Sequence, residues 1–321
     1  MAYVDSVSSI LKPNNRLFIL TRYGRRLPSA PTAVAVVFVI LLLALIPGQI
    51  LGRIVLLSYN GTPRFPNRIQ PIVEPIVQNI TMFLLIFLAL WFWLRFSSKR
   101  PFWTLGLERQ HAFVRLLRGV GIGLLMMTVT AGLSMALGAS VAPGLWHAMG
   151  PAAVGIRFLS LISFFVQGPA EEVLFRGWLL PVLGARYRPW IGIISSSAIF
   201  TLAHGLSGGI TALGFFNLFL FGVFASVYAL AEGGLWGVGA WHAIWNWTEQ
   251  DLLGFVSEGT QHAGLISNIQ IAGRTVITGG SFGPEDGLAF TAVFLIAIGI
   301  LSKLSRRSVD GQKDATGRDS R

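Results

Sequence analysis

Two adjacent glutamates, Glu171 and Glu172, lie in a part of the chain that is otherwise almost free of acidic residues. Long apolar stretches flank them, and His204, His242 and Asn246 lie in two later apolar stretches. A charged side chain in the middle of a bilayer costs about 2.5–3.5 kcal/mol on insertion scales, so ionisable residues at this depth are candidates for function. Two carboxylates and two histidines within a membrane are groups that a hydrolase uses to activate water.

The two glutamates are expected to have different roles. Glu172 and Arg176 are four residues apart in the order that favours an ion pair on a helix, so Arg176 would keep Glu172 ionised and in place as supporting residues. Glu171 points about 100° away around the helix and is free to face a cavity. The residues alone leave open a purely structural role, in which both glutamates pair with Arg176 and hold helices together.

A chemical assignment follows from these residue types. We expect Glu171 to take a proton from a water molecule that His204 holds. His242 and Asn246 are four residues apart and project from one helix face. Both would donate to the oxygen of a tetrahedral intermediate, and one such donor can be worth about 10²–10³ in rate.

A zinc ion is the competing hypothesis for the same residues. Glu171, His204 and His242 would be its ligands, because two histidines and one glutamate with an open position form a known catalytic zinc set. The sequence has no His-Glu-x-x-His helix, which is the strongest zinc signature. The prediction therefore favours water activation by glutamate and histidine, with no cofactor required.

The composition indicates a membrane protein. The chain has 321 residues, of which 53% are hydrophobic and 12% charged, whereas a soluble domain has about 25% charged residues. It contains no cysteine, which excludes disulfides and thiolate chemistry. The net charge of +11 is better explained by cytoplasmic loops beside anionic lipid than by nucleic-acid binding.

The hydropathy pattern predicts an all-α polytopic bundle, because about 20 apolar residues span a bilayer as a helix. About eight candidate spans are present, at roughly 32–51, 76–96, 117–140, 153–184, 190–205, 211–231, 235–255 and 286–303. The fourth is too long for one straight span, and we expect a break at Gly168-Pro169, directly before the two glutamates.

Three segments are expected in the chain. Residues 1–31 form a basic cytoplasmic segment, residues 32–303 a transmembrane domain with its motif core at 150–250, and residues 304–321 a disordered tail.

Lys and Arg counts orient the spans. Of the 25 Lys and Arg residues, 17 lie in four segments, at 1–31, 97–116, 185–189 and 303–321. We therefore expect both termini in the cytoplasm and the protein in a bacterial-type plasma membrane. Glu171 begins the segment that leads to Arg186 and Arg188, which favours a substrate on the cytosolic side.

Three short motifs occur in order along the chain: Glu171-Glu172-x-x-x-Arg176, Phe200-x-x-x-His204 and His242-x-x-x-Asn246. This ordered trio resembles the CPBP family of intramembrane proteases, which comprises CAAX proteases and bacteriocin-processing proteins and is also called the Abi family. The resemblance covers about residues 150–250, and no motif position departs from the family pattern.

The resemblance implies hydrolysis of a peptide bond within or at the membrane. Eukaryotic members remove the last three residues of prenylated CAAX proteins, so the implied partners are membrane lipid and a peptide or protein substrate that can carry a lipid. Glu171 looks like the water-activating base with His204 as its partner, and His242 with Asn246 looks like the oxyanion-stabilising pair. Members are often called metalloproteases, which keeps zinc as the possible cofactor.

Two other functions fit part of the pattern. A transporter or proton relay could use the same titratable residues and a broken helix near the midplane. The chain lacks a second acidic helix with a Gly-Pro break in its other half, which disfavours this reading. A catalytically idle immunity or scaffold protein of the same fold is the other alternative.

Overall fold

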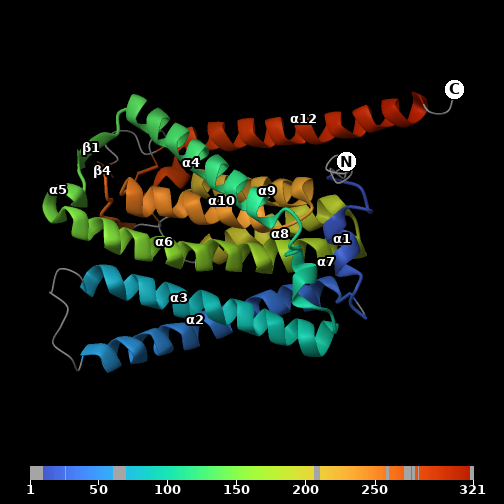
Figure 1. Cartoon of the computed structure of the whole chain (residues 1–321), viewed down its shortest axis with the longest axis horizontal. Coiled ribbons are helices and arrows are strands. Elements are labelled where there is room, and N and C mark those ends of the chain that lie inside the picture. The colour runs from blue at the N-terminus through green and yellow to red at the C-terminus, as the bar shows by residue number, and fades with distance from the viewer. Residues whose placement is uncertain are drawn as a thin grey trace.

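The computed structural model describes residues 10–25, 27–60, 70–205, 210–257, 260–270, 276, 279–280 and 282–318. Within these residues the chain is an elongated bundle of helices (Figure 1). The α-helices are α1 (Arg16–Thr21), α2 (Ala30–Asn60), α3 (Gln70–Trp93), α4 (Ala112–Ala136), α5 (Leu145–Met149), α6 (Pro151–Glu172), α7 (Leu180–Arg186), α8 (Pro189–Gly205), α9 (Ala212–Glu232), α10 (Trp236–Trp247) and α12 (Leu288–Arg318). Short π- and 3₁₀-helices connect them, at η1 (Leu94–Ser98), η2 (Phe102–Leu105), η3 (Val173–Leu179), η4 (Thr248–Leu252) and η5 (Pro284–Asp286).

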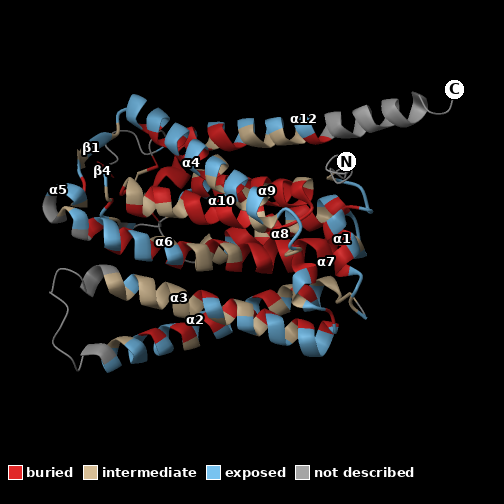
Figure 2. Cartoon of the chain, viewed as in Figure 1, coloured by how far each residue is buried: buried red, intermediate tan, exposed pale blue. Residues whose placement is uncertain are grey.

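The all-α membrane fold is confirmed, although the count of eight spans is approximate. Among the described residues, six helices are long and apolar enough to cross a membrane: α2, α3, α4, the helix that includes α6 and α7, α9 and α12. The predicted spans at 190–205 and 235–255 correspond to α8 with 17 residues and α10 with 12 residues. α10 continues directly as η4 to Leu252, and its residues Gly237–Trp245 are all buried (Figure 2).

The predicted break at Gly168-Pro169 is wrong. α6 runs through both residues to Glu172 and continues as the π-helix η3, so that residues Ala153–Arg186 form one helix. Proline removes one backbone donor, but a helix packed against neighbours tolerates this loss. Gly168 instead permits close packing, because a Cβ there would lie 2.6 Å from the Ala243 amide nitrogen of α10.

Large aromatic side chains fill the space between α9, α10 and α12. Phe221 on α9 lies 4.8 Å from Trp241 on α10 and 5.6 Å from Phe294 on α12, measured between ring centroids. Trp241, Trp245 and Phe294 are fully buried. This cluster fixes the face of α10 that carries His242, because Trp241 and Trp245 lock the helix on either side of that residue.

Two antiparallel ladders lie at the end of the bundle near α5 (Figure 1). β1 (Ser140–Pro143) pairs with β4 (Ser267–Gln270), and β2 (Val256–Ser257) pairs with β3 (Thr260–Gln261). The first ladder joins the loop after α4 to the loop after η4, so residues far apart in sequence form one cap (Figure 1).

Both terminal segments contain helix. In the basic segment 1–31, of which residues 1–9 and 26 lie outside the described residues, α1 packs Leu17, Phe18 and Leu20 into the core. The tail 304–321 was predicted to be disordered; α12 extends to Arg318, and residues 319–321 lie outside the described residues. A helix that already exists extends residue by residue without the cost of a new nucleus, which composition alone does not reveal.

Candidate active site

Three separate helices bring the predicted titratable residues together. Glu171 lies in the last turn of α6, His204 in the last turn of α8, and His242 in the middle of α10. The Glu171 Oε2 atom is 3.6 Å from His204 Nε2 and 3.9 Å from His242 Nε2. Glu171 and His242 are buried, and His204 is partly exposed. The structure therefore places a carboxylate oxygen between two imidazole rings.

The second glutamate forms a fully buried network. Arg176 Nη1 donates to Glu172 Oε1 over 3.0 Å, as the spacing of four residues predicted. Arg176 Nη2 donates to the Gly222 carbonyl on α9, and the guanidinium carbon lies 4.5 Å from the centre of the Phe200 ring. The same Glu172 Oε1 atom is 2.8 Å from His242 Nδ1, a contact that the sequence did not predict. Glu172 thus holds both a cation and a site histidine.

These contacts fix which nitrogen of each histidine carries a proton. His204 Nδ1 lies 2.9 Å from the Phe200 carbonyl oxygen, and a carbonyl only accepts, so Nδ1 donates. His242 Nδ1 donates in the same way to the Glu172 carboxylate. In the neutral form both Nε2 atoms therefore carry lone pairs, and both face Glu171 Oε2. The two hydrogens of a water molecule can satisfy two of these three acceptor atoms, and a cation is the other partner that such atoms accept.

The spacing of these donor atoms can be compared with the spacing of ligand atoms in a zinc site. Ligand atoms of a tetrahedral zinc are about 3.3 Å apart, given bonds of about 2.0–2.1 Å. The distances from Glu171 Oε2 to the two imidazole nitrogens are 3.6 and 3.9 Å. Within the described residues, no group of three or more His, Asp or Glu side chains has the arrangement of a metal site. The donor types suit zinc, but their spacing is too wide to hold it as they stand.

His204, His242 and Asn246 line one cavity of about 630 Å³. Asn246 is one turn beyond His242 on α10, on the face predicted for it. The structure gives Asn246 a place in the cavity wall, whereas Glu171 is buried and is not one of the lining residues. The carboxamide is therefore available to a bound molecule.

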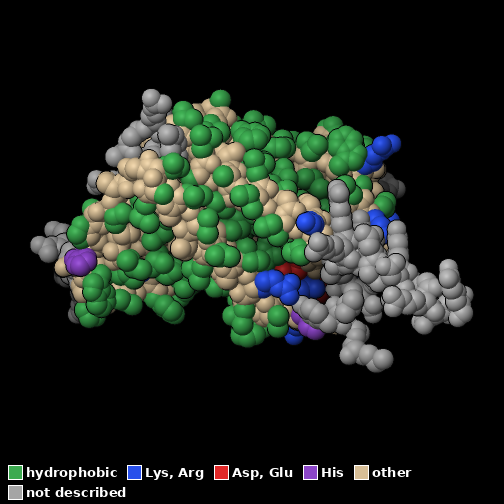
Figure 3. All heavy atoms as spheres, turned by 90° about the horizontal axis from the view of Figure 1, so that it is seen from above, with side chains coloured by type: hydrophobic (Ala, Val, Ile, Leu, Met, Phe, Trp, Pro, Cys, Tyr) green, Lys and Arg blue, Asp and Glu red, His purple; other side chains and the backbone are tan. Residues whose placement is uncertain are grey.

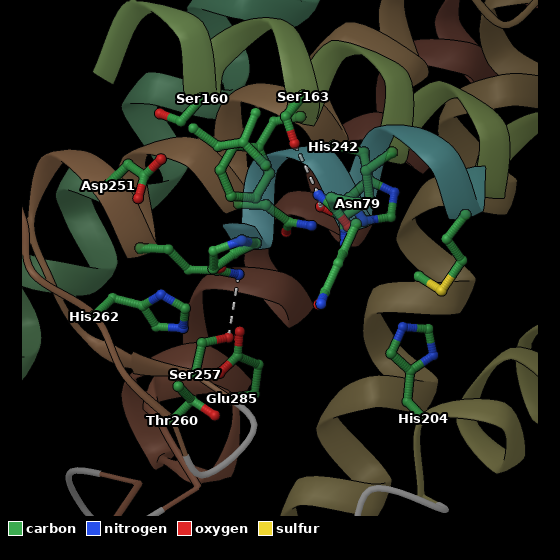
Figure 4. A pocket seen from close by; sticks show the side chains of 18 of the residues that line it. Asn79, Ser160, Ser163, His204, His242, Asp251, Ser257, Thr260, His262 and Glu285 are labelled. Atoms are coloured by element: carbon green, nitrogen blue, oxygen red, sulfur yellow. Dashed lines mark hydrogen bonds between the residues drawn. The ribbon is translucent and has the colours of Figure 1, made fainter. Parts of the chain in front are cut away.

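Part of the cavity wall was not predicted from the sequence. Asn79 on α3 donates to Ser163 Oγ over 3.0 Å and to Gln167 Oε1 over 3.2 Å, both on α6 (Figure 4). Ser160, Ser163 and Gln167 follow one another at intervals of three and four, so they share one helix face. This polar stripe within an apolar span was a signal from which the wall could have been predicted.

A second charged cluster lies across the cavity from the two histidines (Figure 4). Arg157 Nη1 donates to Asp251 Oδ1 over 2.6 Å, and its Nη2 donates to the Ala263 carbonyl. His262, in the loop between β3 and β4, also lines the cavity. Burial, and then the positive charge of Arg157, lower the pKa of His262 to about 4.

The fold and site together define a polytopic membrane protein with a polar centre, built by three helices around a buried cavity. Residues 153–248 match the family model "Type II CAAX prenyl endopeptidase Rce1-like". This match confirms the resemblance to the CPBP family for the segment that holds the glutamates, both site histidines and Asn246.

Comparison with curated proteins gives a shorter match. A relative from Escherichia coli, called "Uncharacterized 24.3 kDa protein", is 38% identical over 80 residues, which are 24% of this chain and 36% of the relative. The chain therefore matches about a third of the length of that curated relative. No solved structure matches the chain.

Proposed function

We propose that the protein is an intramembrane endopeptidase that hydrolyses a peptide bond of a membrane-associated protein or peptide. The position of Glu171 Oε2 between the Nε2 atoms of His204 and His242 carries this proposal. The family match over residues 153–248 supports the same class of reaction, because the matched model describes an endopeptidase. The site would act from within a bacterial-type plasma membrane, with both termini in the cytoplasm.

The proposed reaction begins with a water molecule that donates its two hydrogens to Glu171 Oε2 and His204 Nε2, while His242 is protonated at both ring nitrogens. Glu171 takes one proton, and the resulting hydroxide attacks the carbonyl carbon of the peptide bond. His204 accepts the other hydrogen of the water as a hydrogen bond and so orients the attack. The proton held by Glu171 then passes to the leaving amine as the carbon–nitrogen bond breaks.

The tetrahedral oxyanion needs donors, which Asn246 and His242 would supply. The Asn246 carboxamide donates directly from the cavity wall. His242 donates from Nε2 only as an imidazolium, because Glu172 already holds its Nδ1 proton. The Glu172 carboxylate stabilises that imidazolium, so Glu172 is a positioning residue with an electrostatic role, and Arg176 fixes Glu172 in turn.

Replacement of Glu171 tests the proposal. Glu171→Gln keeps the shape of the side chain but removes the base, so substrate cleavage should fall by about 10²–10⁴-fold. Mass spectrometry of new protein N-termini in membranes should find fragments that depend on wild-type protein and are missing with Glu171→Gln. Equal amounts of folded variant in the membrane serve as the control. The same fragments in both samples would refute a hydrolase centred on Glu171.

Metal dependence is a separate question about the same residues. When bound, zinc would make a coordinated water more acidic, and Glu171, His204 and His242 would hold the ion. We propose that the reaction requires no metal. Purified protein should then keep its activity after exhaustive chelation, and elemental analysis should find less than one zinc per chain. Loss of activity that zinc restores, together with one bound zinc that His204→Ala removes, would contradict this proposal.

A further inference from the structure

Most of the described Lys and Arg residues lie at one end of the bundle, whereas Arg53, Arg157 and Arg176 lie away from it. The N-terminal segment, the turn after α3 and the end of α7 meet there, as shown by hydrogen bonds from Arg25 N to the Ser98 carbonyl and from Arg186 Nη1 to the Leu27 carbonyl. Arg16 on α1 also pairs with Glu108 at this end. Figure 3 shows the described Lys and Arg side chains of the visible face in the half that contains this end. By the positive-inside rule, this end faces the cytoplasm.

The cavity lies toward the opposite end. α2 leaves the cationic end at Ala30 and α3 returns to it at Trp93, so the end of α2 and the start of α3 lie away from it (Figure 1). Four exposed residues of the cavity wall come from these parts and from the loop after η4, and they mark its mouth: Gln49, Pro75, Thr260 and Ala263. The opening therefore faces away from the cytoplasmic end.

The route toward the cationic end is filled with packed side chains. Every residue from Ala170 to Gly184 is buried, and Arg176 with Glu172 forms a layer that has no exposed surface. His204 lies 15 residues along α8 from Pro189, or about 22 Å at 1.5 Å per residue. The Glu171–His204–His242 site therefore lies far from the cationic end of the bundle. The sequence suggested a cytosolic substrate because Glu171 precedes Arg186, but chain order does not reveal on which side a cavity opens.

The wall between mouth and site is rich in carboxamides. The six carboxamide residues of the wall come from α2, α3, α6, α10 and η4: Gln49, Gln78, Asn79, Gln167, Asn246 and Gln250. A carboxamide offers both donors and an acceptor, as a peptide bond does. An extended peptide backbone would pair with such a wall, whereas a lipid chain would leave its polar groups without partners.

We propose that the substrate is an extended peptide segment on the extracytoplasmic side of the membrane, which enters between Thr260 and Gln49 and is held by the carboxamides. The proposal rests on the proposed peptidase function and specifies its substrate. Asn79 is the central specificity residue of the wall, since it bridges α3 and α6 beside the path to His242. The segment would have to be unwound, because an intact helix keeps its own backbone groups paired.

The first test concerns the side of the opening and needs no activity. The chain has no cysteine, so single cysteines can be introduced without background. Thr260→Cys lies at the mouth, and Gln110→Cys is exposed in the turn before α4 at the cationic end. In intact cells, a membrane-impermeant maleimide should label Thr260→Cys fully and Gln110→Cys only after permeabilisation. The reverse pattern would overturn the proposal whatever the protein catalyses.

The second test uses the fragments that depend on Glu171. Their cleavage sites should lie in extracytoplasmic segments or at the outer ends of membrane spans. Sites in cytoplasmic tails would overturn the extracytoplasmic substrate while leaving the peptidase function intact. If no fragment depends on Glu171, the peptidase function fails instead, and the labelling result still decides where the cavity opens.

A matched pair of variants tests the carboxamide wall. On a substrate found in this way, Asn79→Leu should raise KM about 2- to 10-fold and leave kcat nearly unchanged, because a net hydrogen bond to the bound peptide is lost. Gln110→Leu makes the same amide-to-leucine change outside the cavity and should leave both constants unchanged. If KM were unchanged in Asn79→Leu, the carboxamide wall would have no role in substrate recognition.

Discussion

Two buried ion pairs involve residues of α6, and their surroundings differ. The inner pair, Arg176 with Glu172, has no exposed surface, and Glu172 also holds His242. The outer pair, Arg157 with Asp251, is 7–8% exposed and joins α6 to η4 and to the Ala263 carbonyl. The inner pair touches a residue of the proposed chemistry, whereas the outer pair touches a loop at the cavity mouth. The same residue types therefore serve different roles, which depend on what else each carboxylate contacts.

Removal of the inner carboxylate should have the largest effect. Glu172→Gln leaves the Arg176 charge buried without compensation, which costs about 3–5 kcal/mol of stability. It also removes the charge that favours the His242 imidazolium, so cleavage should fall even in the fraction that remains folded. Thermal unfolding in detergent micelles and cleavage per folded molecule measure the two effects.

The exposed pair of Arg16 and Glu108 provides the matched control, because its side chains are 44% and 28% exposed. Glu108→Gln should cost at most about 1 kcal/mol and leave cleavage unchanged. If Glu172→Gln proved no more damaging than Glu108→Gln, the inner pair would have neither of the roles assigned to it.

Removal of the outer carboxylate should have a smaller and different effect. Asp251→Asn leaves Arg157 beside a cavity that water can enter, so we expect a loss of about 1–3 kcal/mol. The loop at the mouth would loosen, which raises KM for the substrate more than it lowers kcat. Steady-state kinetics of Asp251→Asn and Glu172→Gln on one substrate distinguish the pairs. If kcat fell as much for Asp251→Asn as for Glu172→Gln, the two ion pairs would not have the different roles assigned to them.

Much of the inner region could be predicted from the sequence, because its signals are local. The spacing of Glu172 and Arg176 predicted their ion pair, which is present. The cost of burying isolated polar groups predicted that Glu171, His204 and His242 would meet, and Glu171 Oε2 lies within 3.9 Å of an imidazole nitrogen of each histidine. The contact between Glu172 and His242 could not be predicted, because it depends on how far α10 is turned against α6.

The outer region depends on contacts between distant segments, and the sequence revealed less of it. Arg157 and Asp251 are 94 residues apart and meet only because α6 and η4 pack together. Asn79 was missed for the same reason, since its partners lie on another helix. Hydropathy also cannot tell a span that faces lipid from one enclosed by protein, so α8 and α10 were counted as ordinary spans.

The smallest predicted effect concerns His262, which faces Arg157 in the outer region. Its pKa is about 4 in the folded protein and about 6.5 in an unfolded chain, so the neutral form is favoured by folding. This contribution is present above pH 6.5 and is lost as the pH falls from 6.5 to 4, by an amount on the order of 1–3 kcal/mol. Unfolding temperatures across this range should fall less steeply for His262→Gln than for wild type. His147→Gln changes an exposed histidine and should follow wild type; identical curves for all three would mean that burial and Arg157 do not keep His262 neutral in the folded protein.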